Sequence, residues 1–342
     1  MALKTAQTII KTIYGDFVIT EPVLIELLAS KAMQRLKKVH QFGISHYVNR
    51  NGDYTRYDHS VGVFALLRRY NQSLPEQISG LLHDVSHTIF SHVADYLFEN
   101  EHNLEHSYQD SIHKWFLEKT DIVGIVTKYG YTLDDFMHKN GNFPALEQDL
   151  PNLCADRIEY TLYEYAITLG LDNHDQIRER IEYFLAHLHF ENGLWFFDNL
   201  AAARAYADLP LEFTRDRWAS VCAMYTYTMA AKMLRRAVEI KLIDYDTIHF
   251  GTDDDVWQKM QASRDQQIQD YLDKICHYSH AYRLSGANDY NMHLKTKFRG
   301  VDPLVTTLQG LQRLSKLDPE FERAFMALKA QVQQGAYIKS LV

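Results

Sequence analysis

The stretch LLHDVSHTIFSH, Leu81 to His92, places three histidines and an aspartate among leucines, isoleucine and phenylalanine. Buried imidazole and carboxylate groups are unfavourable unless they have partners. We interpret the stretch as part of one buried helix, opened by Pro75, whose polar side chains meet partners or a metal ion. On such a helix His83 and Asp84 lie about 100° apart and can angle toward one point. His87 then lies one turn from His83 on the same face.

Two other segments offer further ligands for the same point. His59 lies in RYDHSVGVFALL, near the start of an apolar helix predicted from about Asp58 to Tyr70. Asp156 lies in NLCADRIEYTL, another largely apolar helical segment. The alternative for Asp156 is an ion pair with Arg157 or a neighbour, and its apolar surroundings favour the ligand interpretation. Imidazole and carboxylate together suit a first-row transition metal or magnesium.

The rest of the chain is predicted to be mainly helical, because apolar residues recur at helical spacing in most segments. The fold class is all-α with a few short β-hairpins, which are expected around the turn signals Asn51-Gly52 and Asn192-Gly193. The segments expected to form the other elements are a helix from Pro22 through about residue 42, an amphipathic helix in 104–119, a helix from Pro151 ended by Gly170, a long helix over 215–243, two shorter helices after about 248, a strand within 297–305, and a helix from Pro319.

Composition narrows the class of partner. The net charge is −8 and Lys and Arg form no long stripe, which argues against unassisted nucleic-acid binding. A local basic pocket for a small anion stays open. There is no signal-like N-terminal segment and no apolar run near the roughly 20 residues of a membrane helix. The scattered cysteines Cys154, Cys222 and Cys276 are typical of reduced core thiols, so we expect a cytoplasmic protein without a membrane partner.

The ordered motifs RYDHSVGV, LLHDVSHTIFSH and CADRIEY resemble those of the HD-domain metal-dependent phosphohydrolases. A longer match, covering roughly residues 13–240, is to the deoxynucleoside triphosphate triphosphohydrolase branch, which includes bacterial dGTPases and the mammalian SAM-and-HD-domain enzyme. The resemblance implies an HD-domain helical core over 1–245 and a mainly helical C-terminal elaboration over 246–342. It implies a divalent metal ion (Mn, Mg, Fe, Zn or Ni). The implied metal ligands are His59, His83, Asp84 and Asp156.

The resemblance also implies residues for the phosphates and for proton transfer. Positions matching Arg56, Arg157, Arg217 and His92 contact the phosphate chain in the family, and His87 matches a residue near the reactive phosphate. His106 is the candidate general acid or base, with Asp95 to orient it. Ser107 stands where the family has a glutamate, and His102 and His113 are competing choices.

Five further positions match those that hold the sugar in the family: Gln41, Phe42, Tyr160, Glu164 and Tyr225. Phe42 replaces a leucine and Glu164 replaces an aspartate, so the resemblance leaves the choice of sugar open. The alternative for Tyr160 and Tyr225 is a place in the core, which is the usual environment of helical tyrosines.

These observations predict a metal-dependent phosphohydrolase that acts on a nucleotide, splitting a (deoxy)nucleoside triphosphate into nucleoside and triphosphate through metal-activated water. The alternatives are a phosphatase for nucleoside monophosphates or other phosphate esters, a di-iron oxygenase that uses the extra histidines, and a non-catalytic nucleotide sensor. The resemblance implies a homo-oligomer. Ala29 stands where nucleotide-activated members carry an acid, so we expect no obligate activation, although Gln34 and Lys37 remain at effector positions.

Overall fold

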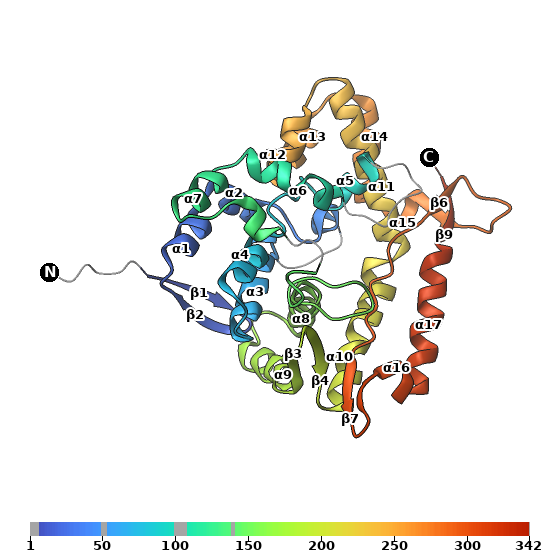
Figure 1. Cartoon of the computed structure of the whole chain (residues 1–342). Coiled ribbons are helices and arrows are strands. Elements are labelled where there is room, and N and C mark those ends of the chain that lie inside the picture. Colours follow the sequence, from blue (N-terminus) through green and yellow to red (C-terminus); the bar gives the residue numbers. More distant parts are fainter. Residues whose placement is uncertain (1–6, 49–52, 99–107, 138–140, 342) are drawn as a thin grey trace.

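The computed structural model describes residues 7–48, 53–98, 108–137 and 141–341, and it is mainly helical (Figure 1). The predicted all-α class with a few small sheets is confirmed. The α-helices of the described part are α1 (Pro22–Ala29), α2 (Lys31–Arg35), α3 (Arg56–Arg69), α4 (Leu74–Leu82), α5 (Val93–Phe98), α6 (Tyr108–Glu118), α7 (Ile122–Lys128), α8 (Ala155–Leu169), α9 (His174–His187), α10 (Leu200–Phe213), α11 (Val221–Glu239), α12 (Tyr245–Phe250), α13 (Asp253–Ala262), α14 (Gln266–Cys276), α15 (Tyr278–Ala281), α16 (Leu314–Leu317) and α17 (Pro319–Gln334). Shorter 3-10 turns are η1 (Leu36–Lys38), η2 (Gly43–Tyr47) and η3 (Leu133–Phe136), and η4 (Thr214–Trp218) is a π-helical turn.

Three small sheets lie within the described residues. Their strands are β1 (Thr8–Thr12), β2 (Gly15–Ile19), β3 (Leu188–Glu191), β4 (Leu194–Phe197), β5 (Tyr282–Leu284), β6 (Met292–Leu294), β7 (Leu304–Thr307), β8 (Gly310–Arg313) and β9 (Ala336–Ser340). The spatial orders are β1-β2, β3-β4-β7-β8 and β5-β9-β6. The hairpin predicted at Asn192-Gly193 is confirmed, and both turn residues have positive φ, 51° and 77°. Two positive-φ residues are what a tight two-residue hairpin turn requires.

The stretch that carries the histidine cluster is not one helix, so that prediction is wrong. α4 ends at Leu82, and residues 83–92 form turns that lead into α5. Phe90 and Ser91 have φ of 54° and 52°. A right-handed helix cannot pass through two successive left-handed residues. The turns nevertheless stay buried, and Ile89, Phe90 and Val93 belong to a core cluster shared with α11, α13 and α14.

α3, α4 and α8 gather at the centre of the molecule, where α3 packs against both of the others (Figure 1). Thr55 caps α3 by accepting a hydrogen bond from Asp58 N at 3.2 Å, and Asp58 accepts from Thr55 N at 3.0 Å. This capping box fixes where the helix begins and therefore where Arg56 and His59 point. A Cβ at Gly62 would overlap the Glu159 side chain of α8, so glycine lets the two helices approach closely at this point.

Three other predicted elements differ from the structure. The helix expected over 22–42 is interrupted at Ser30, whose hydroxyl caps α2 by accepting from Met33 N at 3.2 Å. The helix expected over 215–243 is interrupted between η4 and α11, where Ser220 caps α11 by accepting from Ala223 N at 3.2 Å. Residues 43–47 form the 3-10 turn η2 rather than a strand. Asn51-Gly52 lies outside the described residues. In both interrupted helices a serine, Ser30 or Ser220, accepts a backbone hydrogen bond and so starts a new helix.

The C-terminal third packs against the rest at several places. β7 pairs in parallel with β4, α13 and α14 pack in the cluster around α11, and α17 lies against α10. The helices predicted after residue 248 and from Pro319 are confirmed. The predicted boundary at residue 245 stays a prediction.

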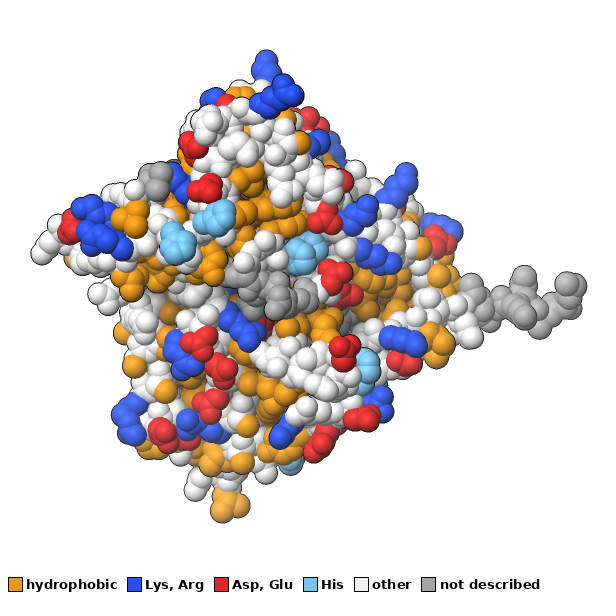
Figure 2. All heavy atoms as spheres, turned by 180° about the vertical axis from the view of Figure 1, so that it is seen from behind, with side chains coloured by type: hydrophobic (Ala, Val, Ile, Leu, Met, Phe, Trp, Pro, Cys, Tyr) orange, Lys and Arg blue, Asp and Glu red, His pale blue; other side chains and the backbone are white. Residues whose placement is uncertain are grey.

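The surface carries mixed charge. On the face shown in Figure 2, Lys and Arg side chains are interspersed with Asp and Glu rather than gathered by sign. Among the described residues, no helix is long and apolar enough to cross a bilayer.

Candidate metal centre and substrate pocket

A cavity of about 710 Å³ lies between the turns after α4, the start of α8, η4 and the segment before β7. This volume is in the range of small-ligand sites. Thirteen of the residues predicted for the site line it: Gln41, Phe42, Arg56, His83, Asp84, His87, His92, Asp95, Asp156, Arg157, Tyr160, Glu164 and Arg217. His59 lies just behind the wall and contacts two of them.

The predicted metal-binding side chains of His59, His83 and Asp156 converge on one point. His59 Nε2 lies 3.1 Å from His83 Nε2 and 3.0 Å from Asp156 Oδ1. One ligand atom from each lies within 4.8 Å of the others, a spacing that suits a shared metal ion. Among the described residues, Arg157 pairs with Glu147, whereas Asp156 Oδ1 lies against the two histidines.

The hydrogen bonds behind the two histidines show that this cluster fits a cation. His59 Nδ1–H donates to Glu159, and His83 Nδ1–H donates to Gly80 O at 2.7 Å. Both Nε2 atoms are therefore left facing each other and an Asp156 oxygen, which is unfavourable without positive charge between them. Burial alone would lower the pKa of His59, but Glu159, Asp156 and Asp84 outweigh it and raise the pKa to about 10. The donor set of two imidazoles and a carboxylate matches a transition-metal ion.

Asp84 approaches the same point from the turn after α4. Its Oδ2 lies 3.5 Å from His59 Nε2, and its Oδ1 lies 3.5 Å from His83 Nε2. Arg56 donates to its Oδ2 at 2.6 Å. Burial alone would raise the pKa of Asp84, but His87, His83 and Arg56 hold it well below its ordinary value. The predicted set of four thus surrounds one point, and its binding of a metal stays a prediction.

The three arginines predicted to contact phosphate all have protein partners. Arg56 is buried, and besides Asp84 it donates to Ser91 Oγ at 3.0 Å and Gln41 O at 3.3 Å. Arg157 donates to Glu147 at 2.9 Å, and Arg217 donates to Glu164. These contacts fix the arginines in the wall of the cavity.

A second group of potential ligands, Glu147, Cys154 and Asp156, shares Asp156 with the first. Arg157 donates to Glu147 and also lies 3.1 Å from Cys154 Sγ. Its guanidinium already supplies the positive charge that this group needs. Burial raises the pKa of the Cys154 thiol beyond its ordinary value, so the thiolate that a metal requires is disfavoured. We therefore assign no metal to this group.

Among the described residues, Asp95 contacts His92 and the start of α6. Its Oδ2 lies 3.0 Å from His92 Nδ1, and its Oδ1 accepts from Tyr108 N at 2.9 Å. Burial lowers the pKa of His92, against the opposing effect of Asp95. His106 lies outside the described residues, together with His102 and Ser107. The competing choice His113 is buried beside Ser86 and does not line the cavity.

Tyr225 is placed away from the cavity, so its predicted contact with the sugar is wrong. Its side chain is fully buried and packs against Tyr282 at 4.7 Å between ring centroids. Tyr227 and Trp218 line the cavity in its place. The break at Ser220 resets the helical register between Arg217 and α11, which turns a different tyrosine toward the site.

Several site residues were not assigned from sequence. Glu159 holds His59, and its presence in ADRIEY three residues after Asp156 was the available signal. Asp110 of α6 also lines the cavity, where burial and the nearby Asp84 and Asp156 raise its pKa to about 6. Lys297 and Arg299 reach the cavity from a segment about 140 residues beyond Asp156. No pattern in the residues around Lys297 and Arg299 had indicated that they reach the cavity.

Comparisons with known proteins identify the family. The HD domain model matches residues 56–124. The chain is 32% identical over 332 residues to the uncharacterized protein YdhJ of Bacillus subtilis, spanning 96% of this chain and 98% of that one. It is 30% identical over 262 residues to the metal-dependent phosphohydrolase cns2 of Cordyceps militaris, spanning 75% of this chain and 73% of cns2.

Of two further similarities, one covers a small part of this chain and the other shows the fold alone. A match of 34% identity over 89 residues to the deoxynucleoside triphosphate triphosphohydrolase SAMHD1 of Xenopus laevis spans 22% of this chain and 14% of that protein. The crystal structure of a phosphohydrolase from Bacteroides thetaiotaomicron has the same fold, with a TM-score of 0.66 at 13% identity over 92% of this chain and 95% of that one. The ordered motifs, the histidine–carboxylate cluster and the similarity to cns2 agree, and the chain belongs to the HD-domain family of metal-dependent phosphohydrolases.

Proposed function

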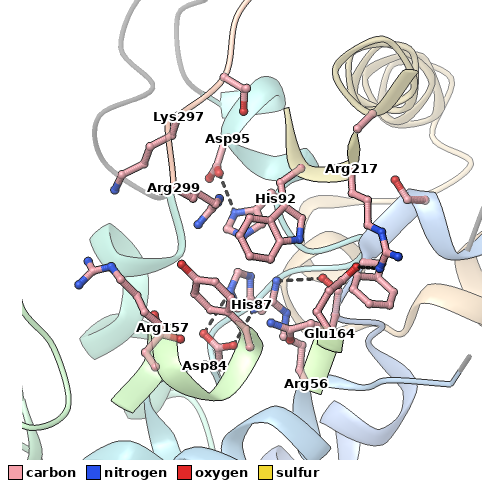
Figure 3. Close-up of a pocket in the computed structure, with 18 of the residues that line it drawn as sticks. Arg56, Asp84, His87, His92, Asp95, Arg157, Glu164, Arg217, Lys297 and Arg299 are labelled. Atoms are coloured by element: carbon pink, nitrogen blue, oxygen red, sulfur yellow. Dashed lines mark hydrogen bonds and ion pairs between the residues drawn. The ribbon is translucent and has the colours of Figure 1, made fainter. Parts of the chain in front are cut away.

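We propose that the protein hydrolyses (deoxy)nucleoside triphosphates to the nucleoside and inorganic triphosphate. The observation that carries this proposal is the position of the histidine–carboxylate cluster between two different sides of one cavity. In Figure 3, Arg157, Lys297 and Arg299 lie on one side, Glu164 and Arg217 on the other, with Asp84 and His87 between them.

The side with Glu164 and Arg217 suits a nucleoside. Phe42, Tyr160, Trp218 and Tyr227 line the same cavity, and Tyr160 and Trp218 contact each other edge to face at 5.2 Å. Aromatic rings stack on bases, and the Glu164 carboxylate can accept hydrogen bonds from a sugar. The partial similarity to SAMHD1 supports a nucleotide substrate of this kind.

The opposite, cationic side suits the phosphate chain, which would place the phosphorus next to the nucleoside beside the cluster. We assign His59, His83, Asp84 and Asp156 as the residues that hold the metal. A divalent cation held there supplies an activated water near neutral pH and neutralises charge on the phosphoryl oxygens. Arg56 orients Asp84 through the 2.6 Å hydrogen bond, and Glu159 orients His59.

We assign His92 and Asp95 as the proton-transfer pair. In the neutral ring, Nδ1–H of His92 donates to Asp95, which leaves Nε2 to accept a proton and pass it on. His87 Nε2 lies 3.2 Å from Asp84 Oδ1, so we assign it to the region of the reactive phosphate. The role predicted for His106 stays a prediction.

A second candidate substrate is a nucleoside monophosphate. It is favoured by the partners of Arg56, Arg157 and Arg217, which are all carboxylates of the protein. Arginines already paired with acids offer less positive charge to a long anion.

The test is to strip the purified protein of metal and reload it separately with Mn²⁺, Mg²⁺, Fe²⁺, Zn²⁺ or Ni²⁺. Each form is incubated with the common dNTPs, NTPs and nucleoside monophosphates without added effector, and the products are resolved by ion-pair chromatography. We expect nucleoside and triphosphate in equal amounts, and none from His83→Ala. Orthophosphate from monophosphates, with no turnover of any triphosphate, would replace the proposal by the second candidate.

A further inference from the structure

The segment 295–303, which we name the strap, joins β6 to β7 and contributes Thr296, Lys297 and Arg299 to the cavity. Both its ends are held by sheets, since β6 pairs with β9 and β7 pairs with β4. The strap itself has no regular secondary structure. Its course past the cavity is therefore decided by its anchoring contacts.

Contacts along the strap fix its position. The ring of Phe298 packs edge to face against Phe325 of α17 at 5.1 Å. A Cβ at Gly300 would overlap the Phe298 ring, so the backbone lies tight against it. Asp302 N donates to Pro151 O at 3.0 Å, and the Asp302 carboxylate accepts from Ser315 N and Oγ at 2.9 and 2.6 Å. These contacts hold the strap against α17 and the segments that follow β8 and precede α8, so that it forms part of the cavity wall.

The two cations of the strap face the same way. Lys297 and Arg299 both line the cavity, whereas Phe298 between them packs against α17. Phe298 therefore anchors the strap to α17 while the residues on either side of it stay at the cavity. In Figure 3 both side chains enter the drawn pocket on the side of Arg157.

Unlike Arg56, Arg157 and Arg217, these two cations form no ion pair with an acid among the residues that the structure describes. Within the described part of the chain, neither Lys297 nor Arg299 has a hydrogen-bond or ion-pair partner. Burial, with Arg299 and Arg157 nearby, lowers the pKa of Lys297, against the opposing effect of Glu147 and Asp110. Such an arrangement of cations becomes favourable when an anion binds among them.

We propose that Lys297 and Arg299 bind the terminal phosphates of a polyphosphate substrate and so select triphosphates over monophosphates. This inference rests on the proposed function for the placement of the nucleoside on the opposite side. One phosphate would then lie at the metal cluster, and the further phosphates would extend from it toward the strap, on the side of Asp84 opposite the nucleoside. The specificity for chain length would then come from the C-terminal third, outside the matched HD region.

Calorimetric titration of full-length protein, loaded with metal and dialysed, with inorganic tripolyphosphate tests the inference without turnover. We expect Lys297→Ala and Arg299→Ala each to weaken the Kd by about ten- to a hundredfold, and the double variant more, because each removes a charge-assisted hydrogen bond. The matched control is Lys295→Ala, an exposed strap residue that does not line the cavity. It should bind like the wild type. An unchanged Kd in the double variant, with an unchanged Tm, would overturn the inference.

Kinetics on the same variants separate this inference from the proposed function. If the wild type hydrolyses a dNTP, the double variant should raise its KM by at least about tenfold and leave kcat nearly unchanged. An unchanged KM would overturn the inference and leave the triphosphohydrolase assignment standing. If no triphosphate is hydrolysed but tripolyphosphate binding still requires both cations, the strap site stands and the proposed reaction fails.

Discussion

At the scale of single residues, the centre depends on Glu159, a fully buried acid that does not touch the cavity. It accepts hydrogen bonds from His59 Nδ1 and from Tyr54 Oη, the latter at 2.5 Å. The Tyr54 ring is in turn stacked on Tyr163 at 3.8 Å. This network fixes the tautomer and the direction of His59, so that Nε2 faces His83 and Asp156. Partners of this kind also raise the basicity of a metal-binding imidazole.

Replacing Glu159 by Gln should therefore weaken metal binding without removing any proposed ligand. We expect a loss of about ten- to a hundredfold in metal affinity, measured by competition with a chelating dye, and activity restored at high metal concentration. Glu76→Gln is a matched control, because Glu76 is also buried but accepts from Ala145 N and Leu146 N, away from the cluster. A metal affinity equal in Glu159→Gln and wild type would show that His59 needs no orienting acid.

At the scale of elements, the N-terminus of α13 holds the strained turn that carries His92. The buried Asp253 carboxylate accepts from Phe90 N at 2.7 Å and from His40 N at 2.9 Å. Phe90 and Ser91 both have positive φ, which is unfavourable for residues with a Cβ. By accepting from both backbone N–H groups, one carboxylate thus helps to keep the turn in place. The segment after residue 245 supports the site from this side as well as through the strap.

This contact predicts a particular pH dependence of stability. Burial raises the pKa of Asp253 to about 6, above its ordinary value near 3.8. Between about pH 4 and 6, the Asp253 carboxyl therefore binds more protons in the folded protein than in the unfolded chain. The contribution of Asp253 to the free energy of unfolding falls as the pH rises through this window, and it is constant above it. Asp253→Asn cannot titrate, and it loses one acceptor. In urea unfolding, the stability advantage of wild type over Asp253→Asn should shrink between about pH 4.5 and pH 7. An advantage that grows over this interval would contradict the assignment.

At the scale of the whole molecule, the metal cluster links segments that are far apart in the chain. His59 belongs to α3, His83 follows α4, and Asp156 belongs to the first turn of α8. These helices pack together at the centre of the fold. A cation held between them therefore stabilises the tertiary arrangement, because the unfolded chain does not bring these ligands together.

Removing the metal should lower the Tm of the wild type. Ligand linkage gives about 2.7 kcal/mol when free metal is a hundredfold above its Kd. We expect scanning calorimetry to show a Tm that falls with a chelator and recovers when metal is added back. His83→Ala should unfold at the same temperature with and without chelator. A chelator effect of wild-type size in that variant would mean that the stabilising ion binds somewhere else.

The sequence predicted most of what depends on neighbouring residues. The helical class, the hairpin at Asn192-Gly193 and the helices from Arg56, Tyr108 and Pro319 follow from local periodicity, turn residues and caps. The same local signals failed where a serine divides a helix, because the periodicity continues through the break. The helix expected at Leu81–His92 failed because tertiary burial and the contact with Asp253 favour turns there.

By itself, therefore, the sequence determined the helical class and the small set of histidines and carboxylates that meet at the centre, since motif spacing and apolar context are local properties. Only the tertiary structure decided which cations pair with an acid. Arg56, Arg157 and Arg217 look alike in sequence, yet each is held by an acid, whereas Lys297 and Arg299 form no ion pair with any described residue. It also decided that Tyr227 rather than Tyr225 faces the cavity. The physical reason is that the pairing and exposure of a side chain depend on residues that folding brings to it, as it brings Glu164 to Arg217 across 53 positions of the chain.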